Sequence, residues 1–270
     1  MKLLVLNPFS ATEPGASELY ARISRPDAEF KLENIASVYP LDYVTWGYNT
    51  LKATNATVER IIKAEEEGFD GVFISCVYDP GLYESRHVVD IPVCGAMESS
   101  VLAVAMMGKK FSLLTLPPPV PQIETALIER YGMKDRMASV RYIDIIANKL
   151  YPEVTKPEIV RDKTLAAMRQ CLDDGAEVIL PGCTILGAVM TQFFAEEAKE
   201  VPVPIIDPMV VGYKTTEMMV DMKKLGFPTI SRAGLWKKQP REEFERLRGF
   251  LAENAPAEKY YQGLSKRVTR

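Results

Sequence analysis

The sequence predicts an α/β fold of two similar lobes with parallel sheets, related by pseudo-twofold symmetry, with a cleft between the lobes. The first observation is a block that occurs twice, as GFDGVFISC in residues 68–76 and as GAEVILPGC in residues 175–183. In each copy a glycine follows the acidic end of a helical segment, and a short apolar run leads to a cysteine. This order is typical of a helix, its glycine stop and a buried strand. The second observation is the alternation of predicted strands and helices, which is typical of βαβ units with Rossmann-like sheets.

The spacing between the two copies predicts the domain organisation. Cys76 and Cys183 lie 107 positions apart, and the second half begins with a predicted strand about 108 positions after the first strand. Similar offsets at two separate landmarks indicate a duplicated unit. We predict a discontinuous first lobe of residues 1–98 plus 208–270, and a second lobe of residues 99–207. Because open α/β sheets bind ligands at the carboxyl ends of their strands, both cysteines are expected to face the cleft.

Short apolar runs bounded by turn residues define the strands of each half. They predict strands at residues 2–6, 29–35, 72–75 and 91–94, and then at 111–116, 139–145, 178–180 and 201–206. Helical spacing of apolar residues predicts helices at residues 15–23, 55–67, 96–107, 123–131, 157–172 and 210–224. Asn55 is a candidate N-cap for the second of these helices. The charged tail from Arg241 has a helical pattern to about Glu253.

The composition excludes several classes of protein. With 33 basic and 36 acidic residues the net charge is −3, so no basic field for nucleic acid is expected. No segment approaches the roughly 18 apolar residues of a membrane helix. Four cysteines in 270 residues do not make a disulfide framework, so we expect a reducing cytoplasm. The single histidine, His87, removes most metal-site and Ser-His-type interpretations.

The matched cysteines are the candidate catalytic groups. A thiolate is a base as well as a nucleophile, and a helix N-terminus lowers the thiol pKa below its free value of about 8.5. Cys76 and Cys183 both follow a predicted strand and are expected at strand-to-helix junctions. Two thiols on opposite sides of a flat substrate can remove a proton from one face and return one to the other, which is stereoinversion. A lone cysteine is more often a small core residue, the role we assign to Cys94 and Cys171. A redox pair would favour Cys-x-x-Cys, and zinc would need more ligands.

Further motifs occur over most of residues 1–235 in the order of one known family. They are Leu6-Asn7-Pro8, residues 68–76, Asp79-Pro80-Gly81-Leu82, Pro92 to Gly95 with Glu98-Ser99, Phe111-Ser112 with Thr115-Leu116, Tyr131-Gly132, Ser139-Val140-Arg141, residues 174–183, Pro204 to Asp207, and Leu225-Gly226. On these motifs the sequence resembles the aspartate/glutamate/hydantoin racemase superfamily, and within it the hydantoin and allantoin racemase branch. The tail beyond about residue 240 lies outside the resemblance.

The resemblance implies an isomerase that uses two cysteines as acid and base. It implies Cys76 and Cys183 as the catalytic pair, without a metal, pyridoxal phosphate or any other cofactor. It implies a small-molecule substrate, no nucleic-acid or membrane partner, and a homo-oligomer. The implied lining of the substrate cleft is Asn7, the backbone around Val77 and Thr184, and the loops of Glu98-Ser99 and Thr115. Four aromatic residues could together line the cleft as a wall for the ring substituent, namely Tyr43, Trp46, Tyr48 and Tyr78. For each ring taken alone, packing in the core is the more common role.

The residues after the second cysteine indicate the branch. Free amino acid racemases of the superfamily follow this cysteine motif with an acid or a histidine, whereas here Gly182-Cys183 is followed by Thr184-Ile185. A ring C–H beside a carbonyl is more acidic than the α C–H of an amino acid and needs less help. We therefore predict a racemase or epimerase of a 5-substituted hydantoin or an allantoin-like cyclic ureide. Departures from the branch pattern occur at Phe9, at Thr184 and at residues 117–119, all beside the expected cleft.

Two classes of alternative remain open at this point. One is a cis–trans isomerase, lyase or decarboxylase of a diacid in the same superfamily, and the other is a non-catalytic small-molecule binder on this scaffold. Arylmalonate decarboxylases of the superfamily keep only one of the two cysteines, so the retained pair favours racemisation. A diacid would also call for an electropositive clamp, and the sequence near the cysteines contains no obvious one.

Overall fold

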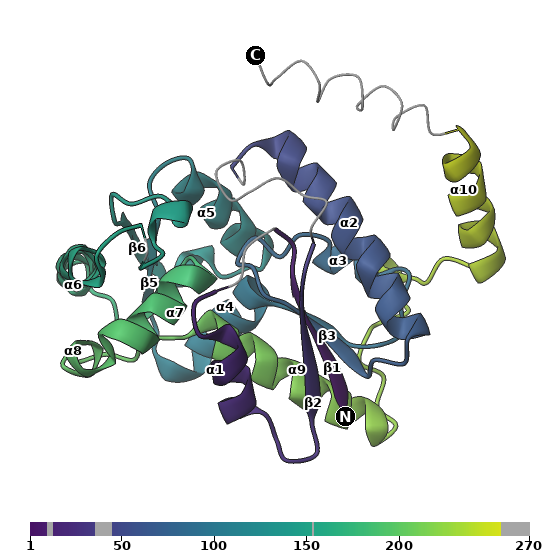
Figure 1. The fold of residues 1–270 in the computed structure, drawn as a ribbon, viewed down its shortest axis with the longest axis horizontal. Helices are drawn as coiled ribbons and strands as arrows, with labels where there is room; N and C mark the ends of the chain where they lie inside the picture. The colour runs from purple at the N-terminus through teal and green to yellow at the C-terminus, as the bar shows by residue number, and fades with distance from the viewer. Residues whose placement is uncertain (10–12, 36–44, 153, 255–270) are drawn as a thin grey trace.

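Two parallel sheets form the frame of the molecule (Figure 1). The computed structural model describes residues 1–9, 13–35, 45–152 and 154–254. The first sheet has the order β2-β1-β3-β4, with strands β1 (Lys2–Asn7), β2 (Glu29–Asn34), β3 (Gly71–Ile74) and β4 (Val93–Gly95). The second has the order β6-β5-β7, with strands β5 (Phe111–Thr115), β6 (Met137–Tyr142) and β7 (Val178–Pro181). All described strand pairs are parallel, as predicted.

The register of the strands repeats between the sheets. In the first sheet Leu3 of β1 lies opposite Gly71 of β3. In the second sheet Phe111 of β5 lies opposite Val178 of β7. These two pairs are related by the offsets of 108 and 107 positions that the sequence predicts. The predicted fold of two similar lobes with parallel sheets is therefore confirmed.

The predicted strand at residues 201–206 is wrong. Only an isolated bridge between Ile179 and Ile205 occurs there, so the second sheet has three described strands. Proline lacks a backbone N–H, and Pro202 and Pro204 remove two donors from this short segment. The remaining backbone bonds run from the Ile179 N–H to the Pro204 carbonyl and from the Ile206 N–H to the Ile179 carbonyl.

The helices surround both sheets (Figure 1). They are α1 (Ala16–Ile23), α2 (Gly47–Glu66), α3 (Leu82–Arg86), α4 (Ala96–Met107), α5 (Val120–Arg130), α6 (Pro157–Asp173), α7 (Thr184–Phe193), α8 (Ala195–Lys199), α9 (Pro208–Lys224) and α10 (Arg241–Asn254). Helix α2 begins at Gly47, so Asn55 lies inside the helix and does not cap it. The pattern did not predict α7, because residues 184–190 are all buried and carry no polar face.

Two helices connect the lobes. Helix α4 follows β4 and packs against β7 of the other sheet, while α9 packs against β3 and β4 and against α4. The largest buried apolar cluster accordingly contains residues of both sheets, such as Phe73 and Phe111, together with Met97 of α4 and Tyr213 of α9. The predicted lobe boundaries, near residues 98 and 207, fall at these helices and stay a prediction.

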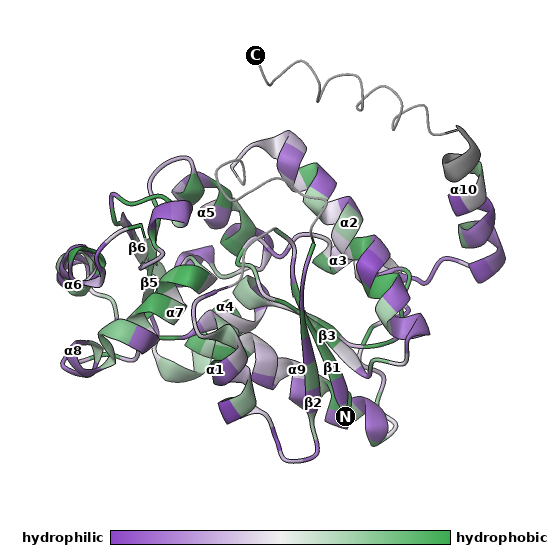
Figure 2. Cartoon of the chain, in the orientation of Figure 1, coloured by the Kyte–Doolittle hydropathy of each residue, from purple (hydrophilic) through white to green (hydrophobic). Residues whose placement is uncertain are grey.

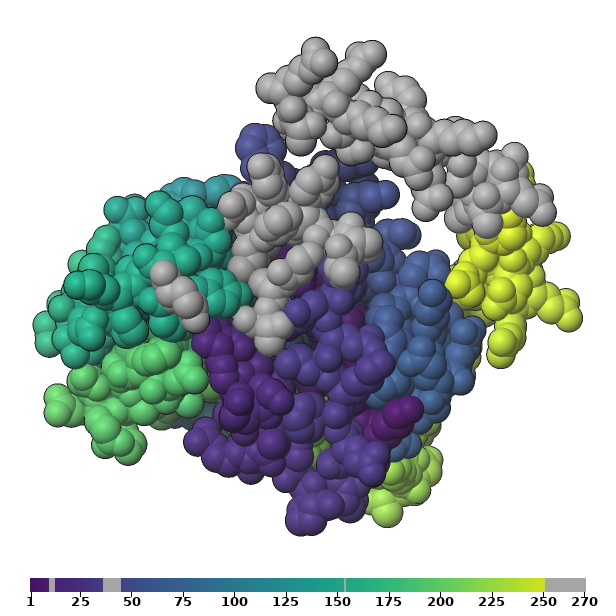
Figure 3. Space-filling view, in the orientation of Figure 1, coloured from purple at the N-terminus to yellow at the C-terminus, as the bar shows by residue number. Residues whose placement is uncertain are grey.

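The C-terminal helix α10 lies at the edge of the molecule (Figure 3). Its residues are mostly hydrophilic, in contrast to the hydrophobic α7 (Figure 2). Arg248 of α10 pairs with Glu59 of α2 at 2.6 Å, which attaches the tail to the first lobe. Among the described residues, no helix has the length and apolar character needed to cross a membrane.

The start of α4 is capped by a carboxylate from another segment. Asp79 accepts hydrogen bonds from the backbone N–H groups of Met97 (3.0 Å) and Glu98 (2.8 Å) and from the Tyr131 hydroxyl (2.7 Å). The residue at the N-cap position is Gly95, and a Cβ added there would lie 2.4 Å from the Asp79 carboxyl group. The glycine therefore leaves the space in which Asp79 satisfies the first turn of α4.

Gly95→Ala is expected to lower the free energy of unfolding by about 2 kcal/mol, because the new methyl group and the Asp79 carboxylate compete for one space. The unfolding midpoint in urea measures this loss. Gly47→Ala in the first turn of α2 is the control, since no atom of the described residues lies within 4 Å of its added Cβ, and it should leave the midpoint unchanged or raise it. Equal midpoints for the two variants would contradict the capping argument.

Candidate active site

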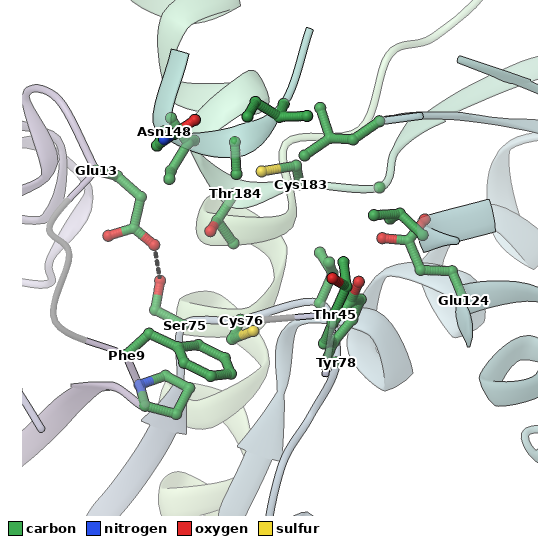
Figure 4. Close-up of a pocket in the computed structure, with 18 of the residues that line it drawn as sticks. Phe9, Glu13, Thr45, Ser75, Cys76, Tyr78, Glu124, Asn148, Cys183 and Thr184 are labelled. Atoms are coloured by element: carbon green, nitrogen blue, oxygen red, sulfur yellow. Dashed lines mark hydrogen bonds between the residues drawn. The ribbon is translucent and has the colours of Figure 1, made fainter. Parts of the chain in front are cut away.

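A mostly apolar pocket lies where the strands of the two lobes end (Figure 4). Its lining includes the end of β1, the segments after β3 and β5, the start of α5 and the junction of β7 with α7. The cavity volume is about 140 Å³, which leaves room for several waters or a small ring. A small molecule fits this space, and a folded macromolecule does not.

Both matched cysteines line this pocket, from opposite sides (Figure 4). Cys183 is the N-cap residue of α7, so its side chain lies beside the first backbone N–H groups of the helix, although its sulfur makes no capping hydrogen bond. Cys76 lies in a turn after β3, and α3 begins only at Leu82. The prediction of two strand-to-helix junctions is therefore correct for Cys183 and wrong for Cys76. The backbone N–H of Tyr78, in the same turn, lies near the Cys76 sulfur and favours its thiolate.

The thiols are harder to ionise than the sequence predicts. Burial raises the pKa of Cys183 to about 12, and the nearby backbone N–H of Leu186 opposes part of that rise. Burial also raises the pKa of Cys76 well above its usual value. The expected lowering by a helix N-terminus is thus outweighed by removal from water, which disfavours the charged form. A thiolate that does form in this pocket is a strong base.

A buried glutamate, Glu13, connects the two lobes. It accepts hydrogen bonds from the Asn7 amide (3.0 Å) and from the Ser75 hydroxyl (2.8 Å, Figure 4), and the side chain of Thr184 in the second lobe lies beside it. Burial raises the pKa of Glu13, and these three side chains oppose the rise. The Tyr20 hydroxyl lies 3.1 Å from Ser75 Oγ and extends the network into the core. Sequence reasoning missed Glu13, because it lies in an irregular segment without periodicity.

A second buried glutamate, Glu124 of α5, lies on the Cys183 side of the pocket. Its exposed fraction is 0%, and neither carboxyl oxygen has a hydrogen-bond partner among the described residues. Burial raises its pKa well above the usual value, with the Thr115 hydroxyl as the opposing neighbour. Sequence reasoning missed Glu124 too, since a glutamate within an amphipathic helix usually faces water.

Of the other residues predicted to line the cleft, some line the pocket and others do not. Asn7, Val77 and Thr184 line the pocket. Glu98 and Ser99, in the first turn of α4, are not among its described lining residues. The Glu98 carboxylate pairs instead with Arg86 in a bidentate ion pair of 2.8 and 2.5 Å. Thr115 is also absent from the described lining, and its hydroxyl donates weakly to the Gly182 carbonyl at 3.4 Å.

The predicted aromatic wall is present only in part. Tyr78 lines the pocket, whereas Trp46 and Tyr48 are 65% and 55% exposed and are not among the described lining residues. Tyr43 lies outside the described residues. The second ring that lines the pocket is Phe9, at the position where the sequence departs from the racemase branch. Within the described residues, no group of three or more His, Cys, Asp or Glu side chains is arranged to hold a metal ion.

Comparison with known proteins identifies the family. A profile of the family described as Asp/Glu/Hydantoin racemase matches residues 42–216. The chain belongs to this family. Membership confirms the predicted family and the predicted enzyme class, an isomerase of the racemase type.

Individual racemases agree with this assignment in sequence and in fold. The chain is 31% identical over 226 residues to a hydantoin racemase of Pseudomonas sp. (strain NS671), which covers 83% of this chain and 88% of that protein. It superposes on an allantoin racemase from Klebsiella pneumoniae with a TM-score of 0.75 at 23% identity, covering 89% of this chain and 94% of the other. An arylmalonate decarboxylase shares the fold at a TM-score of 0.53 and 13% identity, over 82% and 92% of the two chains.

Proposed function

We propose that the protein racemises a 5-substituted hydantoin or an allantoin-like cyclic ureide, with Cys76 and Cys183 as base and acid and with no cofactor. The observation that carries the proposal is the pair of thiols, at matching positions of the two lobes, on opposite sides of one small pocket. The names of the racemases that it resembles, hydantoin and allantoin racemase, favour a ring substrate.

The chemistry needs only the two thiols and the ring. One cysteine, as thiolate, removes the proton from C5, and the C–H electron pair moves toward the adjacent carbonyl to form an enolate. The other cysteine, as thiol, gives its proton to the opposite face of C5 as the carbonyl reforms. The product is the other enantiomer, and the two sulfurs have exchanged their protonation states.

The charge of the pocket separates this proposal from reactions of a diacid. Among the described residues that line it there is no Lys, Arg or His, and the two acidic residues are Glu13 and Glu124. A dianionic substrate would lose its hydration there without gaining a cationic partner. A neutral ring with N–H and C=O groups avoids that cost, so the racemase is favoured over the lyase, the decarboxylase and the cis–trans isomerase.

Proton NMR in D2O tests the proposal on single enantiomers of 5-substituted hydantoins and of allantoin. We expect enzyme-dependent exchange of the C5 proton together with loss of optical rotation, above the rate without enzyme. Exchange on none of these rings would contradict the proposed function. If the same ligands raised the melting temperature without exchange, the non-catalytic binder would be supported.

The rate is expected to rise with pH. Because burial raises the pKa of both thiols, most of the enzyme at pH 7 has both cysteines protonated, and the active form has one thiolate. Below the pKa the thiolate fraction grows tenfold per pH unit, so kcat/KM should grow by about tenfold per unit between pH 7 and 9. Initial rates, corrected for exchange without enzyme and for ionisation of the substrate, measure this slope. A plateau already reached at pH 7 would contradict raised thiol pKa values.

A further inference from the structure

The carboxyl group of Glu124 is buried without a partner. Its side chain is fully enclosed, and neither oxygen has a hydrogen-bond partner among the described residues. The Thr115 hydroxyl beside it donates to the Gly182 carbonyl at 3.4 Å. Leaving a buried polar group unpaired is costly, so native proteins retain such groups where a ligand or a reaction uses them.

This carboxyl group points into the pocket. In Figure 4 it extends from α5 toward the space between Cys183 and Tyr78. Glu124, Tyr78 and Cys183 line the same pocket, and a charge on Glu124 would raise the pKa of the other two groups. A ring bound between the two cysteines would share this pocket with Glu124.

The hydrogen-bond donors to Glu13 in the first lobe can be compared with the corresponding residues of the second lobe. There, Asn7 and Ser75 both donate to Glu13. At the offsets of 108 and 107, the corresponding residues of the second lobe are Thr115 and Gly182.

The glycine removes one donor and also makes space. A Cβ added at Gly182 would lie 2.5 Å from Glu124 Oε2. Among the described residues, the second lobe thus has a buried carboxyl group with the Thr115 hydroxyl beside it and no hydrogen bond to either oxygen.

We propose that Glu124 is a catalytic residue, whose protonated carboxyl group donates a hydrogen bond to the substrate carbonyl oxygen next to the C–H that is exchanged. This inference rests on the proposed racemase function. As the thiolate takes the C5 proton, the C–H electron pair forms the C=C bond and the carbonyl π pair moves to oxygen. The Glu124 O–H stabilises that oxygen and keeps its own proton, and the carbonyl reforms when the second thiol protonates C5.

The surroundings favour the neutral form that this role requires. No cationic side chain lines the pocket among the described residues, and burial disfavours a carboxylate. A protonated carboxyl group has one O–H to donate. A donor that is aimed at developing negative charge in an enclosed site contributes about 10²–10³-fold to kcat.

Two variants of the full chain test the role, with a ring that the wild-type enzyme racemises. Glu124→Leu has no donor and should lower kcat by about 10²–10³-fold while KM changes only a few-fold. Glu124→Gln keeps an N–H donor of lower acidity, so its kcat should fall less, by about tenfold. A kcat of Glu124→Leu within threefold of the wild type would overturn the inference.

Stability separates a catalytic role from a structural one. Glu124→Leu replaces an unpaired polar group with an apolar one of similar size, so its melting temperature should equal or exceed that of the wild type. In the wild type, the folded state keeps a proton that the unfolded state releases above its ordinary pKa of 4.5. Wild-type stability should therefore fall as pH rises above that value by more than the stability of the variant. If Glu124 had a structural role instead, Glu124→Leu would have a lower melting temperature than the wild type.

Glu217→Gln is the matched control. Glu217 is a buried glutamate of α9 outside the described lining, paired with Lys214 at 2.7 Å, so its substitution should leave kcat unchanged.

If Glu124→Leu does not fold, the kcat of Glu124→Gln decides, and an unchanged kcat of that variant overturns the inference. A wild-type enzyme without turnover on any ring overturns the proposed function, and this inference with it. Wild-type turnover with fully active Glu124 variants overturns this inference alone.

Discussion

Cys76→Ser and Cys183→Ser are each expected to abolish racemisation, with a loss on the order of 10³-fold or more in kcat. Each half of the inversion uses one sulfur on one face of the substrate, so neither cysteine replaces the other. A serine hydroxyl is a far weaker acid than a thiol and forms no useful base at neutral pH. Polarimetry on single enantiomers measures the loss directly. Racemisation by both variants at near wild-type rates would contradict the two-base proposal.

The same variants should separate the two half-reactions. With one thiol intact, a variant still removes the proton from the enantiomer that presents C–H to that sulfur and returns solvent deuterium to the same face. Exchange without inversion is then expected from one enantiomer with Cys76→Ser and from the other with Cys183→Ser. Exchange of both enantiomers by one variant would mean that a group other than the cysteines acts as the second base.

The remaining cysteines are natural controls. Cys94 and Cys171 are buried and are not among the described lining residues of the pocket. Burial raises the pKa of each thiol to about 11, which keeps both protonated at neutral pH. Cys94→Ala and Cys171→Ala should therefore change the melting temperature at most and leave kcat unchanged.

The frame of the fold could be predicted because it is repeated. A run such as Val72 to Ile74 identifies a buried strand by its length and its glycine boundary, and a second copy at a constant offset fixes the second sheet. The segment at 201–206 fails under the same rule, because apolar character alone does not report the N–H donors that Pro202 and Pro204 remove.

The chemistry of the pocket was less accessible from the sequence. Cys183 and its helix N-terminus could be predicted from neighbouring residues, but the rise of its pKa comes from burial by segments far away in the chain. Glu13 and Glu124 lie far from both cysteines in the sequence, and only the folded chain brings them to the same pocket. The repeat itself contains a signal for them. Ser75 and Gly182 occupy the same position of the two blocks, and exchanging a hydroxyl for a hydrogen there decides whether the nearby carboxyl group is satisfied.

Glu13→Leu is expected to destabilise the protein strongly, by about 2–4 kcal/mol in the free energy of unfolding. The substitution leaves Ser75 without its acceptor, removes one of two bonds of the Asn7 amide, and releases Thr184 beside Cys183. The urea midpoint measures the loss. Glu13→Gln should fall in between, since its amide oxygen still accepts from one of these donors.

The sign of this effect is opposite to the sign expected for Glu124→Leu, although both variants exchange a buried glutamate for leucine in the same pocket. Glu13 accepts hydrogen bonds from two side chains, whereas Glu124 accepts none from the described residues and has only the Thr115 hydroxyl beside it. If the two variants shifted the urea midpoint equally and in one direction, the hydrogen-bond assignment of both carboxyl groups would be contradicted. A lower midpoint for Glu13→Leu with an unchanged or higher one for Glu124→Leu would mean that one lobe uses its carboxyl group to hold the structure, and that the other keeps it for the substrate.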